Sequence, residues 1–198
     1  MLEDSEEHVS RIEQESSPTV ESSKIHHIPT DFPSFQRILV AYDGMKMSKI
    51  ALYYAAYISK ISDSEIVLIN IIKARRNLIN VLPVTIVANL HKEEIDIAAS
   101  HREGVIQDKF LLEVIEEMTT ACKAAGITKK TIFKIYGGNP ADEIINLTNL
   151  MQFDLIVMGS GRIASMIEGL GSTARKVAAT CKVPLLIIQK QPRYKDEW

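Results

Sequence analysis

Five short apolar runs, separated by amphipathic stretches, organise most of the chain. The runs contain few polar residues and little alternation, which is typical of strands covered on both faces of a parallel sheet. Turn residues follow the first run at Asp43-Gly44 and the third at Gly137-Gly138. The predicted strands span residues 37–42, 65–72, 131–136, 153–158 and 183–189.

Between these runs, apolar residues recur every three or four positions, which predicts helices with one buried stripe. Gly126 is expected to end one helix, and Pro140 lies near the first turn of another. Residues 73–104 have no clear period and are predicted to form a loop with a short helix near 86–100. The other helices are expected over about 46–61, 105–125, 140–151 and 172–181.

Strands that alternate with helices indicate an α/β fold. The pattern predicts a Rossmann-like domain: a five-stranded, parallel, doubly wound sheet with helices on both faces and right-handed crossovers.

The two ends of the chain differ from this pattern. Residues 1–35 hold eight acidic and two basic residues, a net charge of −6, together with seven serines and three prolines. Such a segment buries too little apolar surface to offset its ordering entropy, so we expect a disordered acidic tail. The domain is predicted over 36–190, and 191–198 is expected to be a short polar tail.

Charge, apolar runs and cysteine content indicate which partners and which location are not expected. The total charge of −2 leaves +4 for the residues after the acidic segment, too mildly basic to favour nucleic acid as a partner. No apolar run reaches 18 residues, so a membrane partner is not expected. The acidic N-terminus does not resemble a secretory signal, and Cys122 and Cys181 lie far apart. A cytoplasmic location is therefore the expectation.

Four of the nine glycines fall within residues 159–171, between the fourth strand and the helix expected from Ser172. A loop with this composition needs unusual backbone angles or close approach by another group. The helix that follows would offer unpaired N–H groups and a positive dipole end, which suit a phosphate, and Ser172 and Thr173 could add hydroxyl groups. A loop that simply turns tightly is the alternative explanation.

The chemistry expected at this loop is binding rather than catalysis. The chain lacks the lysine-containing Walker motif, and no nucleophile–base–acid arrangement is visible. Any hydrolysis of a bound phosphate compound is expected to be slow and incidental.

Five segments in order resemble the universal stress protein family. They are Ile38-Leu-Val-Ala-Tyr-Asp43-Gly, Asn70-Ile-Ile72, Gly138-Asn-Pro140-Ala-Asp-Glu-Ile144, Gly159-Ser-Gly161 followed after nine residues by Gly171-Ser172, and Cys181-Lys-Val-Pro184-Leu-Leu-Ile-Ile188. The resemblance covers residues 37–190. Only Ser160 separates Gly159 from Gly161, which is one residue fewer than the family spacing.

The resemblance implies the strand order 3-2-1-4-5 and, in one branch of the family, ATP bound with or without Mg²⁺ where the order reverses. It implies that Ala41, Asp43 and Ile71 line the adenine side. The residues implied around the ribose and phosphates are Gly159, Ser160, Gly161, Arg162, Gly171, Ser172 and Thr173.

The resemblance thus suggests an ATP-binding regulatory protein of the stress response. Two alternatives stay open from the sequence. The first is a nucleotide-free interaction module that forms a homodimer through the final strand, whose apolar edge needs cover. The second is a metabolic enzyme of the wider nucleotide-binding α/β group. An unidentified protein partner could bind the acidic tail in any of these cases.

Overall fold

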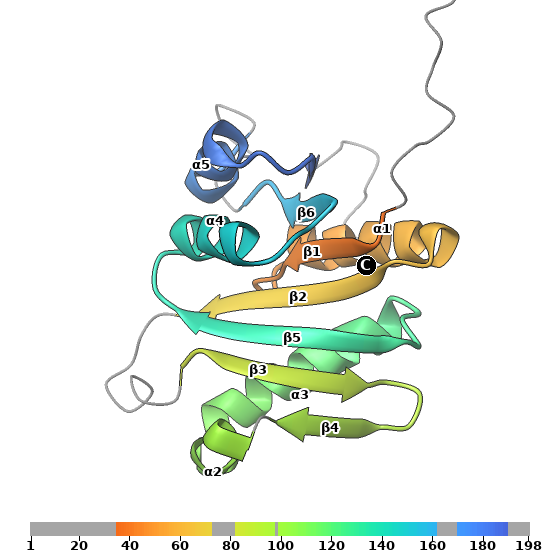
Figure 1. The fold of residues 1–198 in the computed structure, drawn as a ribbon, viewed down its shortest axis with the longest axis vertical. Helices are drawn as coiled ribbons and strands as arrows, with labels where there is room; N and C mark the ends of the chain where they lie inside the picture. Colours follow the sequence, from red (N-terminus) through yellow and green to blue (C-terminus); the bar gives the residue numbers. More distant parts are fainter. Residues whose placement is uncertain (1–34, 73–81, 98, 162–169, 190–198) are drawn as a thin grey trace, which may run out of the picture. The chain divides into compact units, whose positions relative to one another are not determined.

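The computed structural model describes residues 35–72, 82–97, 99–161 and 170–189. In this part of the chain, seven strands form one sheet, and helices pack on it (Figure 1). In chain order the elements are β1 (Arg37–Ala41), α1 (Lys46–Ser62), β2 (Glu65–Ile72), β3 (Val84–Asn89), β4 (Glu94–Ile97), α2 (Ala99–Gln107), α3 (Lys109–Ala124), β5 (Lys130–Gly137), α4 (Pro140–Leu150), β6 (Leu155–Gly159), α5 (Ser172–Thr180) and β7 (Leu185–Ile188).

The sheet is mostly parallel, with strand order β4-β3-β5-β2-β1-β6-β7. The strands β5, β2, β1, β6 and β7 run parallel to their neighbours in this group. By contrast, β3 is antiparallel to both β5 and β4. The predicted α/β class is therefore confirmed, with antiparallel strands added at one edge.

The prediction of a five-stranded, wholly parallel sheet is wrong, because residues 84–97 form two strands instead of a loop and helix. The order 3-2-1-4-5 consequently does not describe the whole sheet, although the five predicted strands lie side by side as β5-β2-β1-β6-β7. The missed signal is the alternation along Val84–Asn89, where every second side chain is buried. The β-branched residues Val84, Thr85, Ile86 and Val87 also favour a strand.

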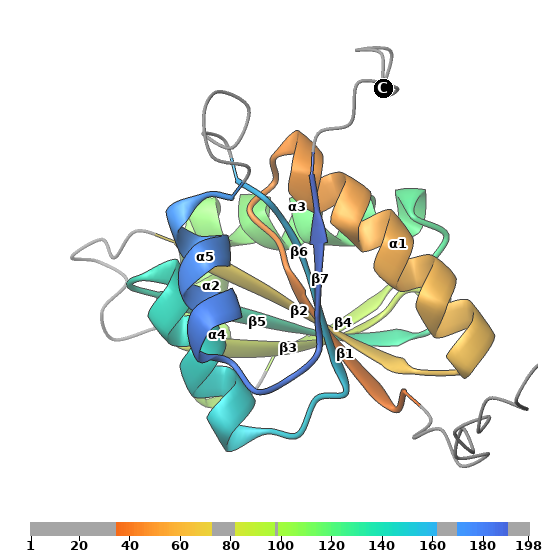
Figure 2. The ribbon, with the colours of Figure 1, turned by 90° about the horizontal axis from the view of Figure 1, so that it is seen from above.

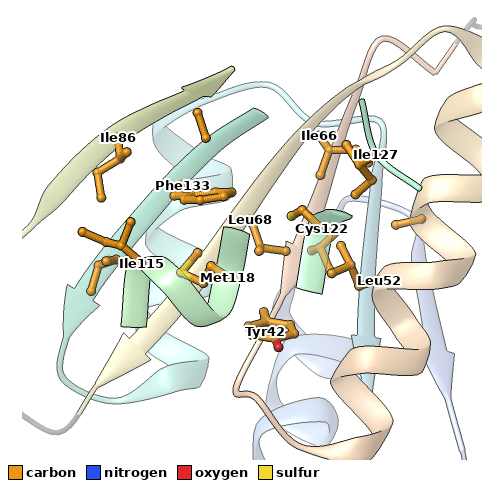
Figure 3. Close-up of a cluster of buried hydrophobic side chains, with 14 of the residues drawn as sticks. Tyr42, Leu52, Ile66, Leu68, Ile86, Ile115, Met118, Cys122, Ile127 and Phe133 are labelled. Atoms are coloured by element: carbon orange, nitrogen blue, oxygen red, sulfur yellow. The ribbon is translucent and has the colours of Figure 1, made fainter. Parts of the chain in front are cut away.

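Helices cover both faces of the sheet, as Figure 2 shows from above. The helices α1 and α3 pack on one face, where their buried side chains join those of alternate strand positions such as Ile66, Leu68 and Phe133 (Figure 3). The helices α4 and α5 pack on the other face, against Leu39, Ile69 and others. The apolar runs of β1 and β2 follow from this double cover, because side chains on both faces are buried.

The long helix predicted over 105–125 is interrupted at Asp108. This residue has extended backbone angles, and its side chain accepts a hydrogen bond from the Leu111 amide at 3.1 Å, which caps α3. Aspartate at a helix N-cap satisfies an otherwise unpaired N–H group. Residues before Asp108 belong to α2 instead.

The predicted tails, residues 1–35 and 191–198, lie outside the described residues except for Phe35, so their predictions are untested. Among the described helices, none combines the length and the apolar character that crossing a membrane requires.

Candidate functional site

The candidate site lies where the strand order reverses. From β1 the chain continues into α1 on one face of the sheet, and from β6 it continues toward α5 on the other. The two strands are neighbours, with Ala41 paired to Met158 near their carboxyl ends. In open α/β sheets, ligands bind outside the carboxyl ends of strands at such a switch point.

Asp43 follows β1 in a turn that is fixed by hydrogen bonds. Its Oδ1 atom accepts from the Met45 amide at 3.0 Å, and its own amide donates to the Ser48 Oγ at 3.3 Å. The bonds tie the aspartate to Met45, the N-cap of α1, and to Ser48 in the first turn of that helix. The Asp43 side chain is exposed at this edge of the sheet, so a ligand can reach it.

Asn70 holds the same turn from the neighbouring strand β2. Its Nδ2 atom donates to the Tyr42 carbonyl at 3.0 Å, and the Tyr42 amide donates to the Ile69 carbonyl at 2.9 Å. Asn70 is buried, and it is an isolated polar residue in an apolar strand. That isolation is the sequence signal that would have identified it as a positioning residue.

Gly159, at the end of β6, brings the glycine-rich segment next to the Asp43 turn. A Cβ atom on Gly159 would lie 2.7 Å from the Met47 Cβ and 3.0 Å from the Ser48 backbone nitrogen. The start of α1 therefore packs directly on the end of β6. Since Ser48 also accepts from the Asp43 amide, the structure brings Asp43 and Gly159 together as the sequence predicts.

Ser160 and Gly171 join the two ends of the glycine-rich segment. The Gly171 amide donates to the Ser160 carbonyl at 2.6 Å, and the Ser160 amide donates to the Ile188 carbonyl of β7 at 2.8 Å. Ser160 is only 1% exposed. These two amides are thus engaged within the protein, and Ser160 supports the turn from inside.

The amino end of α5 presents the remaining predicted phosphate contacts. Gly171 is the N-cap and contributes no side-chain hydrogen bond, while Ser172 is exposed and Thr173 half-buried in the first turn. A helix that begins in this way lacks an internal acceptor for its first amides, and its dipole places positive charge there. Gly161 is exposed and has a left-handed φ of +88°. Arg162 lies outside the described residues.

Ala41 and Ile71 lie on the α4/α5 face of the sheet, at the carboxyl ends of β1 and β2. Both are half-buried, whereas Leu39 and Ile69, which precede them on the same face, are fully buried. The two residues therefore form apolar surface at the edge of the core.

Glu117 of α3 is a charged neighbour that the sequence did not identify. Its Oε1 atom accepts a hydrogen bond from the Tyr42 hydroxyl at 3.2 Å and lies 3.5 Å from the Lys49 Nζ. The pKa of Tyr42 lies well above its usual value, mainly because the hydroxyl is buried and secondly because this carboxylate is close. The hydroxyl therefore stays protonated and links α3 to the β1–α1 turn.

Comparisons with known proteins identify the family of this chain. The sequence profile of the universal stress protein family matches residues 34–189. The chain is also 28% identical over 158 residues to the universal stress protein YxiE of Bacillus subtilis (strain 168), across 78% of this chain and 99% of that protein.

Solved structures of universal stress proteins share the fold. UspA from Lactobacillus plantarum superposes with a TM-score of 0.56 at 15% identity, covering 79% of this chain and 99% of that one. A universal stress protein in complex with cAMP gives a TM-score of 0.52 at 22% identity, covering 78% and 97%. On the match of the family profile to most of its length, this chain belongs to the universal stress protein family.

Proposed function

We propose that the domain binds an adenine nucleotide, ATP with or without Mg²⁺, and acts as a regulatory protein without dedicated catalysis. The observation that carries the proposal is that the α5 amino end, which has no side-chain cap, and the exposed Asp43 turn both lie at the switch point. The amino end of α5 suits phosphate oxygens. The Asp43 carboxylate suits the amino group of adenine, which donates hydrogen bonds.

The contacts suggest that some of the predicted residues bind the ligand and that others support the turn. Ser172, Thr173 and Gly161 face the phosphates in this proposal, while Gly159, Ser160 and Gly171 hold the turn that positions them. Ala41 and Ile71 receive the base. A universal stress protein of the same fold has been crystallised with cAMP, which supports a nucleotide as the class of ligand.

Titration calorimetry of the purified chain with millimolar MgATP tests the proposal. Saturable heat is expected, together with a thermal shift that corresponds to about 2.7 kcal/mol at 100 times the dissociation constant. The variant Ser172→Glu places a carboxylate on the first turn of α5, where it complements the dipole but repels phosphate. We expect it to fold normally and to bind ATP at least about tenfold more weakly, a loss of about 1.4 kcal/mol.

The matched control is Thr180→Glu, at an exposed position at the other end of α5. It adds the same charge away from the phosphates, so ATP affinity should stay near that of the unmodified protein. An unmodified protein that gives neither heat nor thermal shift would reject nucleotide binding.

A nucleotide-free homodimeric module is the second candidate function. Two observations favour it: the Ser160 and Gly171 amides already donate to protein carbonyls, and β7 is a sheet edge with half-buried apolar side chains. Absence of any copurifying nucleotide, combined with a stable dimer, would support this candidate over the first.

A further inference from the structure

Three half-buried side chains form a row across the carboxyl ends of β1, β2 and β5. They are Ala41, Ile71 and Tyr136, and all three pack against the core cluster on the α4/α5 face. Ile71 and Tyr136 are register partners, so their side chains leave the sheet side by side. We call these three residues the edge row. The first two are the predicted adenine-lining residues, and the third was not predicted.

Tyr136 is the aromatic member of the edge row. The pKa of its hydroxyl is raised, mainly because the group is buried and secondly because the Glu143 carboxylate on the first turn of α4 is close. The side chain is therefore a neutral phenol, which presents an uncharged ring beside Ile71. Aromatic rings stack on nucleobases without requiring a particular base sequence or charge.

The spacing of the strands suits a base at this position. Neighbouring strands lie about 4.8 Å apart, so β1 and β5, on either side of β2, are separated by about 9.6 Å. A planar base held above Ile71 would thus have the end of β1, which Asp43 follows, on one side and the Tyr136 ring of β5 on the other.

We propose that Tyr136 forms the aromatic wall of the base subsite and contributes to affinity by contact with the nucleobase. This inference rests on the proposed nucleotide binding and assigns it a residue that belongs to β5, outside the switch-point strands β1 and β6. Its ligand class is an adenine nucleotide, with the base at the edge row and the phosphates at α5.

Calorimetry with two ligands distinguishes the loss of a contact with the base from a general loss of ligand binding. MgATP carries a base, and inorganic tripolyphosphate carries only the anionic part. Tyr136→Ala should weaken ATP binding roughly fivefold to a hundredfold, the range for loss of one base–aromatic stack. The same variant should bind tripolyphosphate as the unmodified protein does. Tyr136→Phe keeps the ring and should change ATP affinity by no more than about twofold.

Two further variants act as controls. Tyr136→Leu preserves apolar bulk and hence the fold, but removes the aromatic ring, so it should lose ATP affinity like Tyr136→Ala. Tyr57→Ala removes a tyrosine that is 67% exposed on α1. This variant should bind both MgATP and tripolyphosphate as the unmodified protein does.

The outcomes distinguish the two proposals. If the unmodified protein binds ATP and the alanine and leucine variants bind it equally well, the role of Tyr136 is wrong while nucleotide binding stands. Equal losses for ATP and tripolyphosphate would also overturn the role, since they indicate a disturbed fold. An unmodified protein that binds no ATP overturns both.

Discussion

At the scale of single residues, the glycines of the loop have different reasons to be glycine. Gly159 lacks room for a side chain because α1 packs on it, and a Cβ atom on Gly171 would lie 2.7 Å from the Ser160 carbonyl oxygen. Gly161 instead needs its positive φ. The concentration of glycine that suggested a phosphate loop is thus partly a requirement of the fold itself, with or without a ligand.

This distinction predicts that Gly159→Ala destabilises the protein even without nucleotide. The added methyl group would meet the backbone of Met47 and Ser48, which cannot rotate away, so α1 must shift. Overpacking of this kind costs about 1–3 kcal/mol. Urea unfolding should show a lower midpoint at an unchanged slope.

Gly126→Asn serves as the comparison for Gly159→Ala. Gly126 has a φ of +74° and open space where a Cβ would lie. Because asparagine tolerates the left-handed region, this change should cost less than the alanine at 159. Equal stability of Gly159→Ala and the unmodified protein would contradict the packing argument.

At the scale of helices and strands, local chemistry predicted the elements that carry their own boundary signals. Asn139 is the N-cap of α4, and its Oδ1 accepts from the Ala141 and Asp142 amides at 3.0 and 3.3 Å. Pro140 follows in the first turn. The missed hairpin of β3 and β4 has no such marker. There, alternation over six residues of β3 was outweighed by the mixed polarity around it.

The cap of α4 gives a prediction for the element. Asn139→Ala removes the acceptor of two first-turn amides and should lower the free energy of unfolding by about 1 kcal/mol. The control is Asn146→Ala, at an exposed position inside the same helix, where alanine is the better helix former. Chemical denaturation of both variants measures the difference. Equal destabilisation by the two changes would exclude a capping role.

At the scale of the whole sheet, the described residues leave two different edges. β4 carries Glu94 and Asp96, both exposed, and charged edge residues discourage pairing with another chain. β7 carries Leu185, Leu186 and Ile187, all half-buried. A homodimer that forms through β7 remains our proposal, and the hairpin of β3 and β4 makes the opposite edge the less suitable one.

The hydrogen bonds of β7 offer a selective test of this dimer. The Pro184 carbonyl accepts from the Ile156 amide of β6, and the Ile188 carbonyl accepts from the Ser160 amide just after β6, both at 2.8 Å. Alternate residues therefore face β6, and the Ile187 amide points to the open side. Ile187→Pro removes that outward donor and spares the bonds to β6. Light scattering should change from dimer to monomer, with the fold retained.

Ile95→Lys at the β4 edge is the control for the dimer and should not alter association. A dimeric Ile187→Pro variant, or a monomeric unmodified protein, would contradict pairing through β7.

The sequence by itself determined the α/β class, the five parallel strands and the family, because apolar runs, helix periods and turn residues act over a few neighbouring positions. It also identified Asp43, the glycine turn and the start of α5 as candidates. The tertiary structure alone decided the antiparallel hairpin and the engagement of the Ser160 and Gly171 amides. It also decided the contacts of Asn70 and Glu117 with Tyr42 and the position of Tyr136 beside Ile71. These depend on strand register and on contacts between residues far apart in the chain, which no local pattern encodes.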